Sequence, residues 1–587
     1  MTHEIRQFLV SLYGATRANR VYARLQERLT HPPAAPKGRA RWTPDQRDAF
    51  LIAYPDQVRE DRTPSLRTLH TVLQQHVGNL LTGLHLLPFF PASSDEGYSV
   101  MDYRRVDRRF GEWADIAQLG GTYQLMFDAV INHASVASAW FTGFLQGEPT
   151  YDDFFVTVAG DPDLSAVVRP RELPLLTAVD SAQGTKKVWT TFSADQADLN
   201  YHNPDVLLEI VDLLIFYADR RADLLRLDAI AYLWKEVGTR CIHLPQTYEV
   251  IRLLRASLDI CAPHVALVTE TNVPHAENIT YFGDGSDMAQ MVYNFGLPPL
   301  VLHAIVNGSA SVLARWLSQL AVPPGQGAFL NFLASHDGIG LQPLRGILSD
   351  AEVADFASKF ERAGALVSYK SDGNGGRSPY ELNMNYFDAV NWAREDDDEE
   401  VKIARFLTAH AILLSLAGVP AIYFHSLFGS RGWAAGPAET GQKRSVNRQR
   451  LNRAELEAEL AEPGSRRSAV LRGLSALLRA RAASAAFHPK GAQAVSEAGT
   501  GVLLIRRTSP SGESAVVCLS NLTARGQDVE WKSELLGEPP NAPVSDLISN
   551  RIVPTAERRV VSLSPYESVW LARPPANPRF LESEELM

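Results

Sequence analysis

The sequence predicts an α/β protein built on a parallel (β/α)8 TIM barrel, with an inserted subdomain after strand 3 and a C-terminal antiparallel β-domain. Two observations predict this fold. Apolar, strand-like runs alternate with longer amphipathic segments, and charged residues stand at the ends of several of these runs. At 587 residues the chain is also long enough to bury a large core and to form more than one domain.

Each barrel strand is expected from a short apolar run bounded by turn residues. The eight runs are residues 49–54, 83–88, 123–128, 224–230, 265–270, 291–294, 327–333 and 417–423. A helical stretch at 401–416 precedes the last run. This alternation is what a parallel barrel requires, because parallel neighbours need a crossover connection.

Changes in composition divide the rest of the chain. Residues 1–30 have helical spacing, and a Pro- and Ala-rich linker follows them. The gap between Asp128 and Asp228 is longer than one β/α repeat needs, and a Gly-, Ser- and Asn-rich segment at 368–388 is expected to be a second long loop. The expected boundaries are 1–47 for an N-terminal helical extension, 48–498 for the barrel, about 134–205 for the inserted subdomain, 499–575 for the β-domain and 576–587 for a mobile tail.

Charge and cysteine content exclude several classes of function. The net charge of −10, without a Lys- or Arg-rich tail, argues against nucleic acid as a partner. The three cysteines Cys241, Cys261 and Cys518 have no metal-like spacing and give no disulfide framework. The first residues lack an apolar signal core and no run of 18 apolar residues occurs, so we expect a cytoplasmic protein without a membrane partner.

Three of the predicted strands deliver a carboxylate at or just beyond their carboxyl ends. Arg226 and Asp228 stand two residues apart in one apolar run. Glu270 ends a second run, and Asp337 follows a third run, directly after His336. Side chains two apart on a strand share a face, and burying such a charged pair is costly without a purpose. Because active sites of barrels lie at the carboxyl ends of the strands, we expect the three acids to meet there.

This set of acids is what the cleavage of a glycosidic bond requires. One carboxylate attacks or stabilises the oxocarbenium-like centre, and a second carboxyl protonates the leaving oxygen. We predict Asp228 as the nucleophile, with Arg226 lowering its pKa, and Glu270 as the acid/base, with its pKa raised by burial. Asp337 is expected to hold sugar hydroxyls. A buried structural ion pair is the alternative explanation for Arg226 and Asp228.

The order of these motifs resembles the four-region pattern of glycoside hydrolase family 13, the α-amylase superfamily. Asn132 and His133, after the strand ending at Asp128, match the Asn-His of the first region. The resemblance extends from about residue 48 to the C-terminal β-domain. Asn132 is expected to be structural rather than a metal ligand, and no metal or cofactor is implied.

Within this family the run from His336 to Gly340 is similar to the sucrose phosphorylase subfamily. The resemblance implies double displacement with retention through a β-glucosyl ester on Asp228, which phosphate then converts to α-glucose 1-phosphate. It implies carboxyl groups about 5–5.5 Å apart in a retaining enzyme. The substrate-binding residues implied by local matches are Asp95, Tyr98, His133, Phe192, Gln196, Arg226, Tyr232, His336 and Arg448, and Arg171 is implied for phosphate.

The segment 369–383 resembles the corresponding loop of the glucosylglycerate phosphorylases. Tyr380 and Glu381 stand where sucrose phosphorylases have Tyr-Gln, and Lys370, Arg377 or Arg431 could bind the carboxylate of glycerate. We therefore expect reversible phosphorolysis of 2-O-α-D-glucosyl-D-glycerate, with the sugar substrate and inorganic phosphate as partners and a monomer or homodimer as the assembly.

Several alternatives stay open at this point. Sucrose or glucosylglycerol could be the substrate, and a hydrolase or transglucosidase would use the same three acids. A non-catalytic family member would be expected to lack one acid, and all three are present. Arg171, Lys370, Arg377 and Arg431 could be solvated loop residues, and Phe89, Tyr98 and Phe192 could be either core residues or platforms for a sugar ring.

Overall fold

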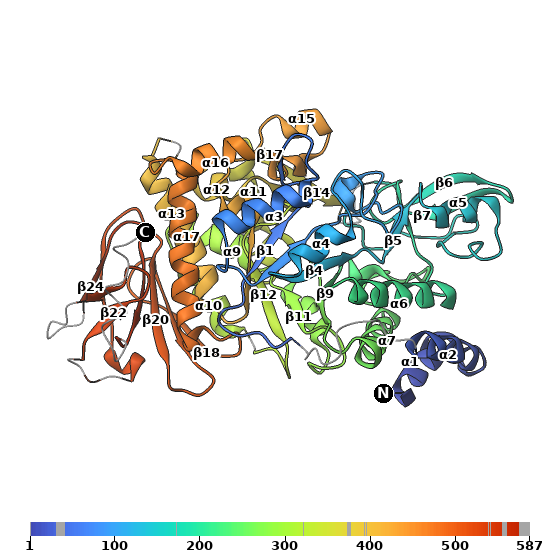
Figure 1. Cartoon of the computed structure of the whole chain (residues 1–587), viewed down its shortest axis with the longest axis horizontal. Coiled ribbons are helices and arrows are strands. Elements are labelled where there is room, and N and C mark those ends of the chain that lie inside the picture. The colour runs from blue at the N-terminus through green and yellow to red at the C-terminus, as the bar shows by residue number, and fades with distance from the viewer. Residues whose placement is uncertain are drawn as a thin grey trace.

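The computed structural model describes residues 2–30, 42–171, 173–320, 322–371, 377–392, 394, 396–537, 539, 542–553 and 560–574. The expected mobile tail, 576–587, lies outside these residues. Figure 1 shows a central barrel with the C-terminal β-domain on one side and the inserted segment and N-terminal helices on the other.

Eight parallel strands close into a barrel, in the order β1-β16-β12-β11-β10-β9-β4-β3. They are β1 (Phe50–Ala53), β3 (Gly83–Leu86), β4 (Gln124–Ala129), β9 (Ala222–Leu227), β10 (Ala266–Thr269), β11 (Met291–Tyr293), β12 (Ala328–Phe332) and β16 (Val419–Tyr423). Each of the eight predicted runs overlaps one barrel strand, so this prediction is confirmed. Large apolar side chains such as Met126, Met291 and Phe332 fill the interior of the barrel, which is a packed core.

Helices connect the strands and cover the barrel. They are α3 (Ser65–His76), α4 (Trp113–Leu119), α6 (Pro204–Asp219), α7 (Pro245–Cys261), α8 (His275–Asn278), α9 (Leu297–Asn307), α10 (Ser311–Gln319), α11 (Asp350–Arg362), α12 (Tyr386–Asn391) and α13 (Glu399–Ser415), with α14 (Phe424–Leu427), α15 (Gly436–Thr440), α16 (Arg453–Ala461) and α17 (Arg466–Ala483) after the last strand. Local sequence sets their ends. Asn203 caps α6 with Pro204 at its first position, and Ser349 and Glu352 form a capping box at α11.

The segment between β4 and α6 carries its own small sheets. It contains β5 (His133–Ser135), α5 (Ala139–Gln146), β6 (Leu176–Ser181), β7 (Gly184–Trp189) and β8 (Gln196–Asp198). β5 pairs with β8 and β6 pairs with β7, each antiparallel, so this segment returns to the barrel close to where it left it.

The Gly- and Asn-rich segment at 368–388 is not the irregular loop that we expected. β14 (Leu366–Ser371) and β15 (Arg377–Asn383) form an antiparallel hairpin, and β15 also pairs with β13 (Ile339–Gly340) just after Asp337. The turn residues of the hairpin made the whole segment resemble a loop. The pairing fixes the hairpin beside the carboxyl end of β12.

The C-terminal domain is antiparallel, as predicted. One sheet has the order β18-β19-β20-β25-β22-β23, and a second pairs β21 (Gln527–Glu530) with β24 (Val560–Leu563). The strands of the larger sheet are β18 (Ala492–Glu497), β19 (Val502–Thr508), β20 (Ala515–Asn521), β22 (Val544–Asp546), β23 (Arg551–Val553) and β25 (Ser568–Ala572). The sheet thus begins before the boundary that we expected at residue 499. Helix α13 packs against β20 and α10 against β18, which joins this domain to the barrel.

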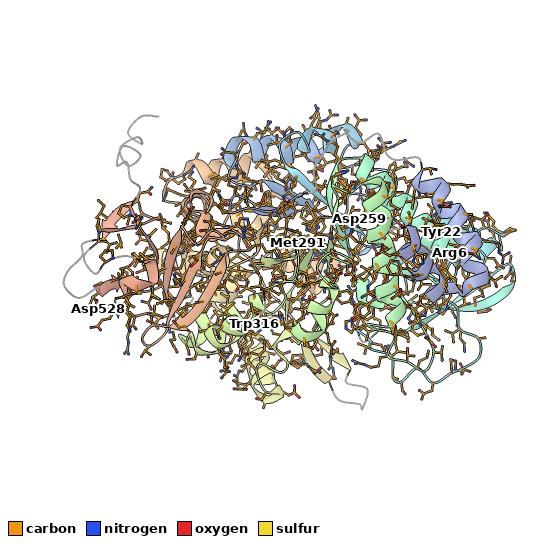
Figure 2. All side chains as sticks on the ribbon, turned by 90° about the horizontal axis from the view of Figure 1, so that it is seen from below. Arg6, Tyr22, Asp259, Met291, Trp316 and Asp528 are labelled. Atoms are coloured by element: carbon orange, nitrogen blue, oxygen red, sulfur yellow. The ribbon has the colours of Figure 1, made fainter. Side chains whose placement is uncertain are left out.

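The N-terminal residues form the helices α1 (Thr2–Tyr13) and α2 (Ala15–Leu29). They pack on each other and on α7, at the end of the molecule opposite Asp528 of the β-domain (Figure 2). Arg6 Nη2 donates to Asn19 Oδ1 at 2.7 Å between the two helices, and the Tyr13 hydroxyl donates to the Tyr201 carbonyl at 3.0 Å. Among the described residues, no helix is long and apolar enough to cross a membrane.

Candidate active site

The three predicted acids meet at one pocket at the carboxyl end of the barrel. Asp228 directly follows β9, Glu270 directly follows β10, and Asp337 lies a few residues beyond β12. Thirteen predicted site residues line this pocket: Asp95, Tyr98, His133, Arg171, Phe192, Gln196, Asp228, Tyr232, Glu270, His336, Asp337, Tyr380 and Glu381. The geometry of parallel strands therefore brings together residues that are far apart in sequence.

Arg226 lies behind the pocket wall and links its acids. The guanidinium is 2% exposed, and its Nη1 donates to Asp228 Oδ1 at 2.8 Å and also contacts Asp128. Nη2 lies 3.8 Å from Glu270 Oε2. Asp128 is held on its other side by His85, whose Nε2 lies 2.8 Å from Asp128 Oδ2. One buried cation thus compensates several carboxylates that would otherwise repel one another.

The two central carboxyls have unusual pKa values. Burial, together with the carboxylates of Asp228 and Asp337, raises the pKa of Glu270 to about 7, against the opposing effect of Arg226. The direction of this shift is the one that we expected from burial. The Ala229 N–H donates to Glu270 Oε2 at 3.1 Å and so fixes the carboxyl beside Asp228.

The pKa of Asp228 is raised overall, although we expected Arg226 to keep it low. Arg226 does lower the pKa of Asp228, but burial is the larger effect and raises the pKa of Asp228 above its usual value. Sequence reasoning identified the charge partner correctly. It underestimated the loss of hydration that comes from placing the carboxyl inside the pocket.

Asp337 lies beside two arginines, Arg444 and Arg448. Burial alone would raise its pKa, but Arg444, His336 and Arg448 together hold the pKa of Asp337 well below its usual range. Arg444 contacts Asp337 Oδ1 directly, and Arg448 Nη2 lies 3.4 Å from the same oxygen. Arg448 Nε also donates to the His336 carbonyl at 2.8 Å. Asp337 is therefore an anion in a fixed position.

The turn after β3 supplies the wall opposite the acids. Asp95 Oδ2 accepts hydrogen bonds from Gln196 Nε2 at 3.2 Å and Arg171 Nη2 at 3.3 Å. Although burial opposes it, these surroundings, chiefly Arg171, lower the pKa of Asp95 to about 2. The ring of Tyr98 stacks on His336, with ring centroids 5.1 Å apart.

Aromatic side chains form one side of the pocket. Phe192 and Tyr232 meet edge to face with ring centroids 5.6 Å apart, and Phe192 also contacts His133. Such faces suit the apolar surface of a sugar ring. Phe89, which could also have been a sugar platform, is instead fully buried against Phe90 and Trp113 in the core and is not part of the pocket.

Glu381 does not point freely into the acceptor region. Its side chain is 3% exposed, and Arg444 binds both carboxylate oxygens, with Nη2 to Oε1 at 2.8 Å and Nε to Oε2 at 3.1 Å. The Gly338 N–H donates to Oε1 as well. Glu381 thus holds Arg444, and Arg444 presents its remaining nitrogen to Asp337.

The other predicted acceptor cations lie outside this pocket. Arg377 belongs to an adjoining pocket that also contains Arg171, Tyr380 and Arg444. Lys370 lies opposite Ser378 in the hairpin, and burial lowers its pKa to about 8. Arg431 pairs with Asp388.

Sequence reasoning missed Arg444 and the pair of His85 and Asp128. Arg444 stands four residues before Arg448, and of these two arginines the resemblance implied only Arg448. His85 and Asp128 are polar residues inside the buried strands β3 and β4. Their position could have indicated the pair, because buried polar side chains need partners.

Comparisons with known proteins identify the family. Residues 76–321 match the model of the α-amylase catalytic domain. A glucosylglycerate phosphorylase of Allomeiothermus silvanus is 47% identical, over 90% of this chain and 95% of that protein. A glucosylglycerate phosphorylase of Escherichia coli is 42% identical, over 97% of this chain and 100% of that protein.

A solved structure with the same fold is the sucrose 6F-phosphate phosphorylase of Thermoanaerobacter thermosaccharolyticum. The two structures superpose with a TM-score of 0.71 at 23% identity, over 83% of this chain and 96% of the other. The barrel fold, the acids at the carboxyl ends of its strands and the similar proteins all indicate the same family. The chain belongs to the α-amylase superfamily, glycoside hydrolase family 13.

Proposed function

We propose that this chain is a retaining phosphorylase that converts 2-O-α-D-glucosyl-D-glycerate and phosphate reversibly to α-D-glucose 1-phosphate and D-glycerate. The observation that carries the chemistry is the meeting of Asp228 and Glu270 beside one buried guanidinium, that of Arg226. The identity of the acceptor is supported by relatives at 42% and 47% identity that are named glucosylglycerate phosphorylase.

In the first step Asp228 attacks the anomeric carbon of the glucosyl group. The bond from that carbon to the glycerate oxygen breaks, and a β-glucosyl ester forms on Asp228. Glu270, whose pKa is raised to about 7, gives its proton to the departing oxygen and becomes a carboxylate. Arg226 contacts both carboxyls and compensates the negative charge as it moves from Asp228 to Glu270.

In the second step phosphate attacks the same carbon from the face that glycerate has left. The ester bond breaks and returns Asp228 to its carboxylate form, while Glu270 takes a proton from the attacking phosphate. Two inversions give overall retention, so the product is α-glucose 1-phosphate. Charge placement and proton transfer by side chains that are already in position lower the activation barriers of both steps.

The glucosyl group is held by the wall of the pocket. We assign its hydroxyls to Asp95, Asp337 and the imidazoles of His133 and His336, and its ring to the faces of Tyr98, Phe192 and Tyr232. Gln196 orients Asp95, and Arg448 orients His336 and Asp337. Hydrogen bonds that the 2-hydroxyl donates to a carboxylate strengthen as the ring flattens, which favours the transition state.

Both acceptors, glycerate and phosphate, are anions. We assign phosphate to Arg171, because this arginine lines the pocket beside Asp95 and the ring of Phe192 and its planar guanidinium suits a phosphate group. Tyr380 and the adjoining pocket that holds Arg377 and Arg444 form the surroundings of the acceptor. Glu381 acts in this proposal by holding Arg444, and Lys370 adds positive charge from the hairpin.

A panel of glucosides tests the acceptor. The purified protein is incubated with phosphate and, separately, with glucosylglycerate, sucrose or glucosylglycerol, and glucose 1-phosphate is measured. We expect the fastest release from glucosylglycerate. Faster release from sucrose or glucosylglycerol would reassign the acceptor, and release of free glucose without dependence on phosphate would make the protein a hydrolase.

The cellular location and the assembly state of the enzyme belong to the same proposal. We place it in the cytoplasm, where phosphate is present, acting as a monomer or homodimer on small molecules alone. Size-exclusion chromatography with light scattering gives the assembly state, and a tetramer would contradict this part.

A further inference from the structure

The turn that carries Asp95 into the pocket has an unusual backbone. Asp95, Glu96 and Gly97 have φ angles of 49°, 53° and 109°. Two consecutive residues with side chains in this left-handed region are strained, and such a turn persists only when its surroundings hold it. Asp95 faces the active-site pocket, while Glu96 and Gly97 line a second pocket on the other side of the turn.

Glu96 is held by Arg450. The two side chains form an ion pair and are mostly buried, with 19% of Arg450 and 20% of Glu96 exposed. The remaining nitrogens of Arg450 are occupied too, Nε by Asp56 Oδ2 at 3.3 Å and Nη1 by the Arg448 carbonyl at 2.7 Å. Each of the three nitrogens of the planar guanidinium thus contacts a different partner, and the single ammonium of lysine could not make all three contacts.

The partners of Arg450 are parts of the barrel frame. Asp56 follows β1, and the parallel pairing of β2 (Val58–Arg59) with β17 (Leu451–Asn452) fixes the segment of Asp56 beside the segment of Arg450. The backbone packs closely under the turn at Gly97, where an added Cβ would meet Pro88 Cβ at 2.8 Å. Beside the turn, the Ser94 hydroxyl contacts Ser99 at 2.8 Å and also Asp195, while the ion pair with Arg450 is the side-chain contact that holds Glu96 itself.

We infer that Glu96 and Arg450 are positioning residues for glucose recognition: their ion pair holds the Asp95 turn in the left-handed conformation that directs the Asp95 carboxylate into the glucosyl pocket. Neither side chain lines that pocket among the described residues, so neither is expected to contact the substrate. The inference rests on the proposed glucosyl transfer. It adds a role for residues that the mechanism does not use.

The experiment compares Glu96→Gln and Arg450→Gln with Arg109→Gln as the matched control. Arg109 lines the same second pocket and loses the same charge, but it pairs with Asp107 and does not contact the turn. We measure kcat and KM for the α-glucoside that the wild-type protein uses best, together with thermal melting. We expect about a tenfold rise in KM for the two turn variants, a smaller change in kcat, and wild-type kinetics for the control.

A double-mutant cycle with Asp95→Asn separates positioning from general stability. If Glu96 acts through Asp95, then Glu96→Gln should have no further effect on KM in the Asp95→Asn background. Additive effects, or turn variants that behave like Arg109→Gln, would overturn the inference. If the wild-type protein releases glucose rather than glucose 1-phosphate, the proposed function fails while the same cycle still tests the turn.

Discussion

At the scale of single residues, the site is organised around the guanidinium of Arg226. Burying a cation is costly, and here it is compensated by Asp128, Asp228 and Glu270. The arrangement leaves one carboxyl, Glu270, with a pKa of about 7, while Asp337 is held as an anion by Arg444 and Arg448. Because the carboxyls differ in pKa, one of them can act as the acid while others stay charged.

The pKa of Glu270 predicts how activity depends on pH. Because Glu270 must be protonated to release the first product, kcat/KM for the glucoside should fall as the pH rises through about 7. The Glu270→Gln variant should lose about 10²–10⁴-fold in rate and should lack this alkaline limb. Initial rates between pH 5 and 9 measure both. An alkaline limb that persists in the variant would assign it to another group.

The nucleophile is tested by Asp228→Asn. We expect turnover to fall by more than about 10³-fold, because no ester can form, while the fold is retained since the amide can still accept from Arg226 Nη1. Circular dichroism and thermal melting serve as controls for folding. Substantial activity in a folded variant would show that another group attacks the sugar.

At the scale of elements, the hairpin β14–β15 fixes the acceptor side of the site. β15 pairs with β13 just after Asp337 and carries Tyr380 and Glu381, so a shift of the hairpin would move Asp337, Glu381 and Arg444 together. The bidentate pair of Glu381 and Arg444 is the main side-chain link between the hairpin and the segment after β16.

Breaking this pair from its two sides should have unequal effects. Arg444→Gln leaves Glu381 buried with its charge uncompensated and should cost about 3 kcal/mol of stability, seen as a lower melting temperature. Glu381→Gln removes the buried charge and should cost clearly less. Equal losses in differential scanning fluorimetry would contradict a charge-based role for the pair.

The same hairpin shows where sequence reasoning ends. The barrel strands were predictable because each is a continuous apolar run, and the acids were predictable because they end such runs. The hairpin was not, because Gly and Asn residues separate its two strands in the sequence, the strands contain polar and charged residues, and β15 pairs partly with the segment after Asp337. The contact of Glu381 with Arg444 joins residues far apart in the chain, so no local sequence pattern predicts it.

At the scale of the whole molecule, the pocket combines residues from several parts of the chain. The barrel supplies Asp228 and Glu270, the segment inserted after β4 supplies Arg171, and the segment after β16 supplies Arg444. These segments lie at the same end of the barrel although they are far apart in sequence (Figure 1). The acids that we propose as catalytic are thus on the barrel frame, while the groups that we assign to the acceptor are on its connections, where specificity can vary without altering the chemistry.

The central claim is that the glucosyl group passes to phosphate through an ester on Asp228, with retention. The most direct measurement is proton NMR of the sugar phosphate formed from glucosylglycerate and phosphate, recorded before any anomeric equilibration. The account predicts α-glucose 1-phosphate as the first product, in an amount equal to the glycerate released. Formation of β-glucose 1-phosphate, or of free glucose in place of the phosphate ester, would contradict it.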